Sequence, residues 1–230
     1  MVNIQKAAVI GCGFVGSTIA YTLMQKGLFS EMVLLDANKA KAEGEAMDIS
    51  HGLPFTHAMD IYAGEYEDIA DASVVIITAG ANQKPGETRL DLVQKNAAIM
   101  RSIIKEIKRV NCEGILLIVS NPVDILTEVA LRESGFPKER VIGSGTVLDT
   151  ARLKYIISEK LDVDSRNVHA FIVGEHGDSE LAAWSCANIY GIKLQDFAKM
   201  RGYEHFAQDM EEVYKGVRDS AYEIIERKGA

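Results

Sequence analysis

Lys6-Ala-Ala-Val-Ile-Gly-Cys-Gly-Phe-Val-Gly16 is the stretch that decides the fold of this chain. Its first five residues predict a buried strand, and the GxGxxG pattern that follows opens a helical pattern over residues 14–26. In such a turn Gly11 makes the bend, Gly13 lets the backbone approach a pyrophosphate, and Gly16 lets helix and strand pack closely. The helix N-terminus then presents unpaired N–H groups and a positive dipole end to the phosphates. The stretch therefore predicts a dinucleotide site.

Asp36 stands twenty residues after Gly16, at the end of a second predicted strand over residues 32–36. Its carboxylate is expected to accept hydrogen bonds from the adenosine ribose hydroxyls and to repel a 2′-phosphate, which favours NAD over NADP. The alternative is that Asp36 only caps the next helix.

Strand-like apolar runs and longer helical patterns alternate through the first part of the chain. Further strands are predicted over residues 74–78 and 115–119, with a helix over 88–110 between them. This alternation predicts an α/β fold in which a doubly wound parallel sheet, the Rossmann arrangement, is covered by helices on both faces. We place this domain at residues 1–143.

The pattern changes over residues 144–230. Helices are predicted over 148–160 and 208–228, and a single strand over 168–173. These are too few strands for a full sheet, so this part predicts an incomplete α+β domain.

Composition limits the classes of function. The chain has 230 residues, 47% of them hydrophobic, and a net charge of −8 without a basic patch, which argues against nucleic acid as a partner. No run reaches the ~20 apolar residues that span a bilayer, and the N-terminus lacks a signal-peptide pattern. Three widely spaced cysteines, Cys12, Cys112 and Cys186, favour reduced thiols in the cytoplasm over disulfides or a zinc site.

A loop is predicted in Gly80-Ala-Asn-Gln-Lys-Pro-Gly-Glu-Thr-Arg-Leu-Asp91, because Pro85 and Gly86 stand at its centre. Gln83 and Arg89 flank that turn. They could close over a small molecule, Arg89 bringing a cation to a carbonyl or carboxylate and Gln83 a neutral donor and acceptor. The alternative is a solvated surface turn.

Three further positions carry candidate chemistry. Asn121 follows the 115–119 strand, where open α/β sheets bind ligands, and could donate to a substrate oxygen; an Asx turn before Pro122 is the alternative. Asp149 and Arg152 share one helix face, which allows either an intrahelical salt bridge or a split role. In the split role Arg152 grips a substrate carboxylate and Asp149 faces a histidine.

His176 is the histidine best placed for that role. It lies in the glycine-rich turn Gly174-Glu-His-Gly-Asp178, where the backbone can hold it at the edge of a cleft. With Asp149 as partner it could act as a general acid and base.

Five motifs, in this order, resemble the L-lactate dehydrogenases of the bacterial type, in the lactate/malate dehydrogenase family. They are Gly11-Cys-Gly-Phe-Val-Gly16, Gln83-Lys-Pro-Gly-Glu-Thr-Arg89, Ser120-Asn-Pro-Val-Asp124, Gly145-Thr-Val-Leu-Asp-Thr-Ala-Arg152 and Gly174-Glu-His-Gly-Asp178. The resemblance covers essentially the whole chain. It implies a cytoplasmic enzyme of glycolysis and pyruvate fermentation that interconverts pyruvate and L-lactate with NAD, and a homotetramer in the full-length form.

The resemblance also implies roles for individual residues. His176 is the implied proton donor and acceptor with Asp149 as its partner, Arg89 polarises the reacting carbonyl, and Arg152 holds the carboxylate. Gln83 matches the position that distinguishes lactate from malate dehydrogenases in this family. The resemblance implies that malate dehydrogenases carry Arg at this position. Implied cofactor contacts, besides the glycines and Asp36, fall on Val15, Lys41, Tyr66, Gly80, Ala81, Ser102, Val119, Asn121 and Ser144.

Two departures from the family pattern leave alternatives open. Members of the family continue past a Gly-Ala like Gly229-Ala230, so this chain resembles one that lacks its C-terminal part, and a truncated NAD-binding chain without turnover is one alternative. A second alternative is a malate dehydrogenase, but Gln83 argues against this function. In relatives activated by fructose-1,6-bisphosphate, a histidine at the position of His169 is paired with an Arg at the position of Lys154. A Lys cannot bind two phosphate oxygens in the forked geometry of an Arg.

Overall fold

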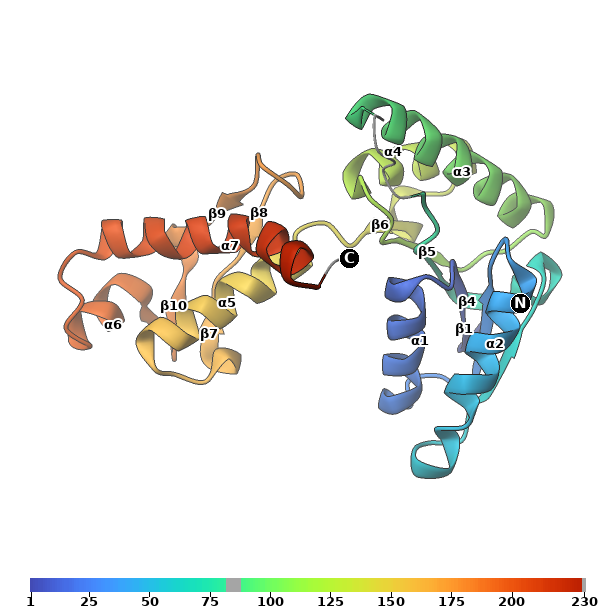
Figure 1. Cartoon of the computed structure of the whole chain (residues 1–230), viewed down its shortest axis with the longest axis horizontal. Coiled ribbons are helices and arrows are strands. Elements are labelled where there is room, and N and C mark those ends of the chain that lie inside the picture. The colour runs from blue at the N-terminus through green and yellow to red at the C-terminus, as the bar shows by residue number, and fades with distance from the viewer. Residues whose placement is uncertain (82–87, 229–230) are drawn as a thin grey trace. The chain divides into compact units, whose positions relative to one another are not determined.

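The computed structural model describes residues 1–81 and 88–228, without the side chain of Arg89. The chain divides into two compact units, Met1–Ser144 and Gly145–Ala230, both drawn in Figure 1. Hydrophobic clusters of buried residues lie within each unit, so each has its own core.

A six-stranded parallel sheet forms the centre of the first unit. Its strands lie in the spatial order β3-β2-β1-β4-β5-β6, and every neighbouring pair runs parallel. This order confirms the predicted doubly wound Rossmann sheet. The sequence pattern had not singled out β3 and β6. The strands are β1 (Asn3–Ile10), β2 (Glu31–Leu35), β3 (Asp60–Ala63), β4 (Ala72–Ile77), β5 (Ile115–Ile118) and β6 (Val141–Gly143).

Helices cover both faces of this sheet because successive side chains of a strand point to opposite sides. Along β1, Ala8 and Ile10 join a buried cluster that includes residues of α3 and α4, whereas Val9 joins one that includes residues of α1 and α2. Figure 1 shows the two helix pairs on opposite faces. The helices are α1 (Phe14–Lys26), α2 (Lys39–Ser50), α3 (Arg89–Arg109) and α4 (Val123–Ser134).

The helix ends of the first unit are capped in different ways. Helix α2 begins after Asn38, whose side chain accepts a hydrogen bond from the Lys41 backbone N–H, and α3 begins with a reciprocal capping box between Thr88 and Asp91. Helix α1 follows Gly13 and has no side-chain cap. Its first backbone N–H groups therefore remain available to a ligand.

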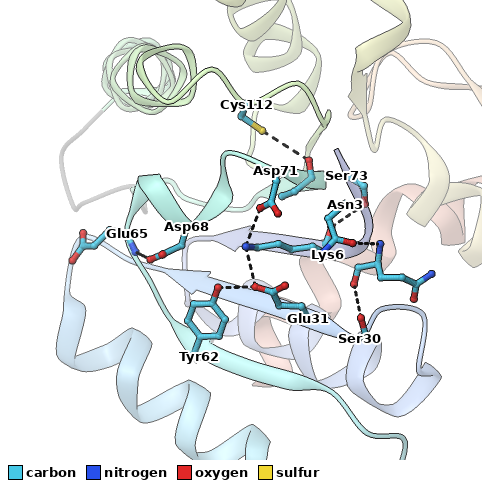
Figure 2. Close-up of polar contacts among 12 residues, drawn as sticks. Asn3, Lys6, Ser30, Glu31, Tyr62, Glu65, Asp68, Asp71, Ser73 and Cys112 are labelled. Atoms are coloured by element: carbon cyan, nitrogen blue, oxygen red, sulfur yellow. Dashed lines mark hydrogen bonds and ion pairs between the residues drawn. The ribbon is translucent and has the colours of Figure 1, made fainter. Parts of the chain in front are cut away.

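A buried lysine of β1 contacts acidic side chains of two neighbouring segments, as Figure 2 shows. Lys6 of β1 is 6% exposed, and its Nζ lies 2.9 Å from Oε1 of Glu31 and 3.0 Å from Oδ1 of Asp71. The Tyr62 hydroxyl donates to the same Glu31 oxygen at 2.8 Å. Burial alone would lower the pKa of Lys6, but its hydrogen bonds to Glu31 and Asp71 raise it above its usual range. The cluster therefore joins β1, β2, β3 and the segment before β4.

The second unit combines three helices with two small antiparallel sheets. One sheet has the order β11-β10-β7 and the other pairs β8 with β9. Helices α5 and α7 pack against each other, and their buried side chains join those of α6 in one core. The elements are α5 (Val147–Leu161), β7 (Val168–His169), β8 (Ile172–Val173), β9 (Leu181–Ala182), β10 (Asn188–Ile189), β11 (Ile192–Lys193), α6 (Leu194–Met200) and α7 (Phe206–Lys228).

The predicted single strand over residues 168–173 is wrong. The segment forms β7 and β8, which pair in different sheets. At the start of β8 the backbone N–H of Ile172 donates to Oγ1 of Thr150 at 3.0 Å, and just before it the carbonyl of Phe171 accepts from Ala183 N at 2.9 Å. Contacts to α5 and to the β9 segment thus replace one continuous ladder. Within the described ranges, no helix is long and apolar enough to cross a bilayer.

Candidate functional site

A cavity of about 1170 Å³ lies in the first unit, where the chain leaves β1, β2 and β4. This is the edge at which parallel α/β sheets bind ligands. Ten of the residues predicted to contact a cofactor line it: Gly11, Gly13, Val15, Gly16, Asp36, Lys41, Tyr66, Gly80, Ala81 and Ser102. The sequence reasoning missed Thr78, which also lines the cavity.

The glycines of the turn differ in the space around them. A Cβ at Gly16 would lie 1.8 Å from the Gly11 carbonyl oxygen, and one at Gly11 would lie 2.6 Å from the Ala79 backbone N. Gly11 also has a φ of +103°, which side chains rarely allow. At Gly13, by contrast, a Cβ would meet no atom within 4 Å. Gly11 and Gly16 are thus required by packing, whereas Gly13 leaves open space beside the uncapped start of α1.

Asp36 is held by the backbone rather than used as a helix cap. Its Oδ2 accepts from the Cys12 N–H at 2.7 Å, and its Oδ1 accepts from the Asn38 N–H at 2.9 Å. Asn38, not Asp36, is the N-cap residue of α2. A fixed carboxylate and an open, uncapped glycine turn on one cavity fit a dinucleotide, because they offer a ribose acceptor and phosphate donors together.

Cys12 lies in this turn, but its thiol is buried. Burial, followed by the nearby Asp36 carboxylate, raises the pKa of Cys12 to about 11. A thiol in that state is a poor nucleophile, because the thiolate is the reactive form.

Three other predicted cofactor contacts, Val119, Asn121 and Ser144, follow β5 and β6 and do not line the cavity. Asn96, which the sequence reasoning missed, fixes this region. Its side chain is buried, accepts from Ala81 N at 2.8 Å and donates to the Asn121 carbonyl at 2.9 Å. It therefore joins the segment after β4 to the segment after β5.

Gln83 lies outside the described residues, and so does the rest of the segment 82–87. Arg89 is the first residue of α3, but its side chain is not among those described.

The second unit brings His176 and Arg152 to the two oxygens of Asp149. Asp149 lies in the first turn of α5, with 2% of its surface exposed. Its Oδ2 is 2.5 Å from Nδ1 of His176, and its Oδ1 accepts from Nη1 of Arg152 at 3.0 Å. The salt bridge and the histidine contact, posed as alternatives from the sequence, exist together. Because an ionised carboxylate only accepts, Nδ1 of His176 carries the proton of this hydrogen bond.

Glu180 is a buried acid that the sequence reasoning passed over. One side-chain atom each of Asp149, His176 and Glu180 lie within 4.8 Å of one another. Burial, followed by the charge of Asp149, raises the pKa of Glu180. Such spacing resembles a metal site, but the Arg152 guanidinium beside Asp149 already supplies a cation there, which disfavours a metal ion.

Lys154 and His169, the candidates for an allosteric phosphate site, belong to α5 and β7, which pack against each other. Lys154 is half-buried and His169 is exposed. The structure thus places both in one unit, and phosphate binding there stays a prediction.

Comparison with known proteins gives matches over the whole chain. Residues 5–143 match the family of the lactate/malate dehydrogenase NAD binding domain, and residues 146–230 match that of the alpha/beta C-terminal domain. An L-lactate dehydrogenase of Acetivibrio thermocellus is 56% identical over 227 residues, which cover 99% of this chain and 72% of that protein. One of Priestia megaterium is 55% identical over 226 residues, covering 98% and 71%.

Solved structures are similar as well. A lactate dehydrogenase from a Medee basin deep-sea metagenome library has a TM-score of 0.96 and 53% identity, covering 100% of this chain and 73% of its own. The minor L-lactate dehydrogenase of Enterococcus mundtii, in its ligand-bound form, has a TM-score of 0.94 and 47% identity, covering 98% and 72%.

Proposed function

This chain belongs to the lactate/malate dehydrogenase family, and we propose on that premise that it interconverts pyruvate and L-lactate with NAD as its cofactor. Its relatives at 56% and 55% identity are L-lactate dehydrogenases, and their matched segments cover nearly all of this chain. The observation in the molecule that carries the proposal is the buried Asp149, which holds His176 through one oxygen and Arg152 through the other.

His176 is the proposed proton donor and acceptor. Reducing a ketone to an alcohol requires a proton at the carbonyl oxygen, and a histidine can supply one near neutral pH. Asp149 supports this role in two ways. It orients the ring through Nδ1, and its negative charge stabilises the protonated ring.

The first unit supplies the proposed cofactor site. Gly13 and the start of α1 bind the pyrophosphate, and Asp36 accepts from the ribose hydroxyls. When bound, NAD carries the hydride that is exchanged with C2 of the substrate. The remaining predicted contacts, including Val119, Asn121 and Ser144, stay proposals for the nicotinamide side.

Substrate recognition is proposed residue by residue. Arg152 binds the carboxylate, because a guanidinium can pair with both of its oxygens. Arg89 polarises the carbonyl, Asn121 donates to a substrate oxygen, and Gln83 favours the methyl group of pyruvate over a second carboxylate. Lys154 and His169 are the corresponding proposal for a phosphate effector.

The domain boundaries and the assembly are proposals too. We assign residues 1–143 to the NAD-binding domain and 144–230 to the N-terminal part of the substrate domain, which the division after Ser144 supports. The chain spans about 72% of the length of its relatives. A cytoplasmic homotetramer is proposed for the full-length form.

The test combines turnover with binding. NADH oxidation by the 230-residue chain is followed with pyruvate and, separately, with oxaloacetate, beside a fluorescence titration of NADH. Faster turnover of pyruvate supports the proposal. Preference for oxaloacetate would make the chain a malate dehydrogenase, and NADH binding without turnover would make it a binding chain only.

A further inference from the structure

Glu180 is the second buried acid beside the histidine. Among the described residues, Asp149 and Glu180 are the buried acidic side chains, at 2% and 6% exposed. Glu180 precedes β9, and its backbone N–H donates to the Gly177 carbonyl at 3.1 Å, which closes the turn that carries His176. Its Oε1 is buried and, within the described part of the chain, has no hydrogen-bond partner.

Charged and titratable groups face Glu180 from each neighbouring element. Asp149 and Arg152 do so from α5, and His176 from the turn. On α7, the Tyr214 hydroxyl donates to the backbone carbonyl of Glu180, with Arg218 and Glu211 near that tyrosine. The Glu180 backbone is thus fixed from both sides, and its carboxyl group is directed into the cluster around Asp149.

Ionising both carboxyl groups is unfavourable in this setting. One oxygen of each group lies within 4.8 Å of the other in surroundings shielded from water, so two negative charges there would repel, which favours a proton on one of them. Asp149 is the ionised member because Arg152 and His176 both compensate its charge. Burial, followed by the charge of Asp149, correspondingly raises the pKa of Glu180.

We propose that Glu180 is a positioning residue, whose neutral carboxyl group donates a hydrogen bond to Asp149 and so fixes the carboxylate that holds His176. This inference rests on the role of His176 in the proposed function. In this role the acid acts through Asp149. A neutral donor locks the orientation of Asp149 while adding no second negative charge beside the histidine ring.

Two variants test whether Glu180 acts as a hydrogen-bond donor. Glu180→Gln keeps a donor of similar shape without a titratable proton, and Glu180→Leu removes the donor. Glu226→Gln is the matched control, because it removes one exposed carboxylate from α7 away from this cluster. All are made in the 230-residue chain, and circular dichroism checks their folding.

Infrared and NMR spectroscopy test the proposal without any turnover. At pH 7 the difference between wild type and Glu180→Gln is expected to contain the C=O stretch of one protonated carboxyl group, absent from the Glu226→Gln difference. The ring titration of His176, assigned with His176→Gln, is expected to keep its midpoint within ~0.3 pH units in Glu180→Gln, because no charge is lost. A missing C=O band, or a midpoint lowered by about one unit, would show an ionised Glu180 and overturn the proposal.

Steady-state kinetics supply the functional readout. Glu180→Leu is expected to lower kcat by ~10-fold with little change in the Kd for NADH, and Glu180→Gln to restore most of that loss. A Glu180→Leu chain with wild-type kcat, or a Glu180→Gln chain as impaired as the Leu variant, would overturn the role. If Glu180→Leu fails to fold, the spectra of Glu180→Gln still decide. Absence of pyruvate turnover in the wild type would instead refute the proposed function and leave the spectra readable.

Discussion

The backbone N–H of Cys12 donates a hydrogen bond of 2.7 Å to Oδ2 of Asp36. This contact joins the glycine-rich turn after β1 to the carboxyl end of β2. Together with the Asn38 N–H on the other oxygen, it orients the Asp36 carboxylate within the cavity. The groups proposed for the pyrophosphate and for the ribose are therefore fixed relative to each other by the backbone.

Cofactor preference is expected to depend on the charge of Asp36. In wild type a 2′-phosphate would lie close to this carboxylate, so we expect NADH to bind at least ~10-fold more tightly than NADPH. Asp36→Ala should reduce that ratio, and Asp36→Asn, which keeps an acceptor but no charge, should reduce it as well. Fluorescence titrations with both cofactors measure the ratio. Equal affinities in the wild type would contradict the assignment.

Gly13→Ala and Gly16→Ala form a matched pair with opposite expected effects. A methyl group at Gly16 would overlap the Gly11 carbonyl, so this variant should lose about 1–3 kcal/mol of unfolding free energy or fail to fold. A methyl group at Gly13 meets open space, so stability should change by less than about 1 kcal/mol while NADH affinity falls at least ~10-fold. Urea unfolding and NADH titration separate the two. A Gly16→Ala chain of normal stability would show that the packing argument is incorrect.

His176→Ala is expected to lower turnover of pyruvate by ~10²–10⁴-fold, because the proton donor is removed. NADH affinity should stay nearly unchanged, since the residues that line the cofactor cavity all belong to the first unit. Asp149→Asn should also lower turnover, because an amide cannot stabilise the protonated ring as a carboxylate does. A parallel loss of NADH binding would point to a structural role for His176.

Gln83→Arg is expected to shift preference from pyruvate toward oxaloacetate. This prediction rests on the sequence, because Gln83 lies outside the described residues. A neutral Gln leaves the second carboxylate of oxaloacetate unpaired, whereas Arg would pair with it. The measurement is the ratio of kcat/KM for the two substrates, with Lys84→Arg as the control in the same segment. An unchanged ratio in Gln83→Arg would refute the role.

Lys6→Met is expected to lower the unfolding free energy by about 1–3 kcal/mol, because it leaves Glu31 and Asp71 without their shared cation. The loss stays below that of a fully buried pair, since these two acids keep 26% and 46% of their side-chain surface exposed. The exposed Arg132 serves as control, and Arg132→Met should lose less than about 0.5 kcal/mol.

The pH dependence of this loss follows from the sign of the pKa shift. The pKa of Lys6 is raised in the folded state, so its stabilising effect is fully present below the ordinary value of 10.5 and is lost only as the pH rises through the folded pKa. The difference between wild type and Lys6→Met should therefore be constant between about pH 6 and pH 9. A difference that disappears within that range would contradict the assigned shift.

Much of the first unit could be predicted because its signals are local. A strand, a glycine-rich turn and a helix lie next to one another in the chain, and Asp36 ends the following strand. The strands β3 and β6 escaped prediction because they are short and are held by parallel neighbours far away in sequence. The interruption of the strand at 168–173 was not predicted for a related reason. The Ile172 N–H donates to the side chain of Thr150, which lies on a helix distant in sequence.

The sequence by itself determined the dinucleotide fold, the family, and the side chains that are candidates for chemistry, because each of these depends on residue type and short spacing. Only the tertiary structure decided which of them meet. It brought His176 to Asp149 across 27 residues of chain, kept Arg152 on the same carboxylate, and buried Glu180 beside both. Burial and the distance between charges set the proton affinity of an acid, and neither can be read from the order of residues along the chain.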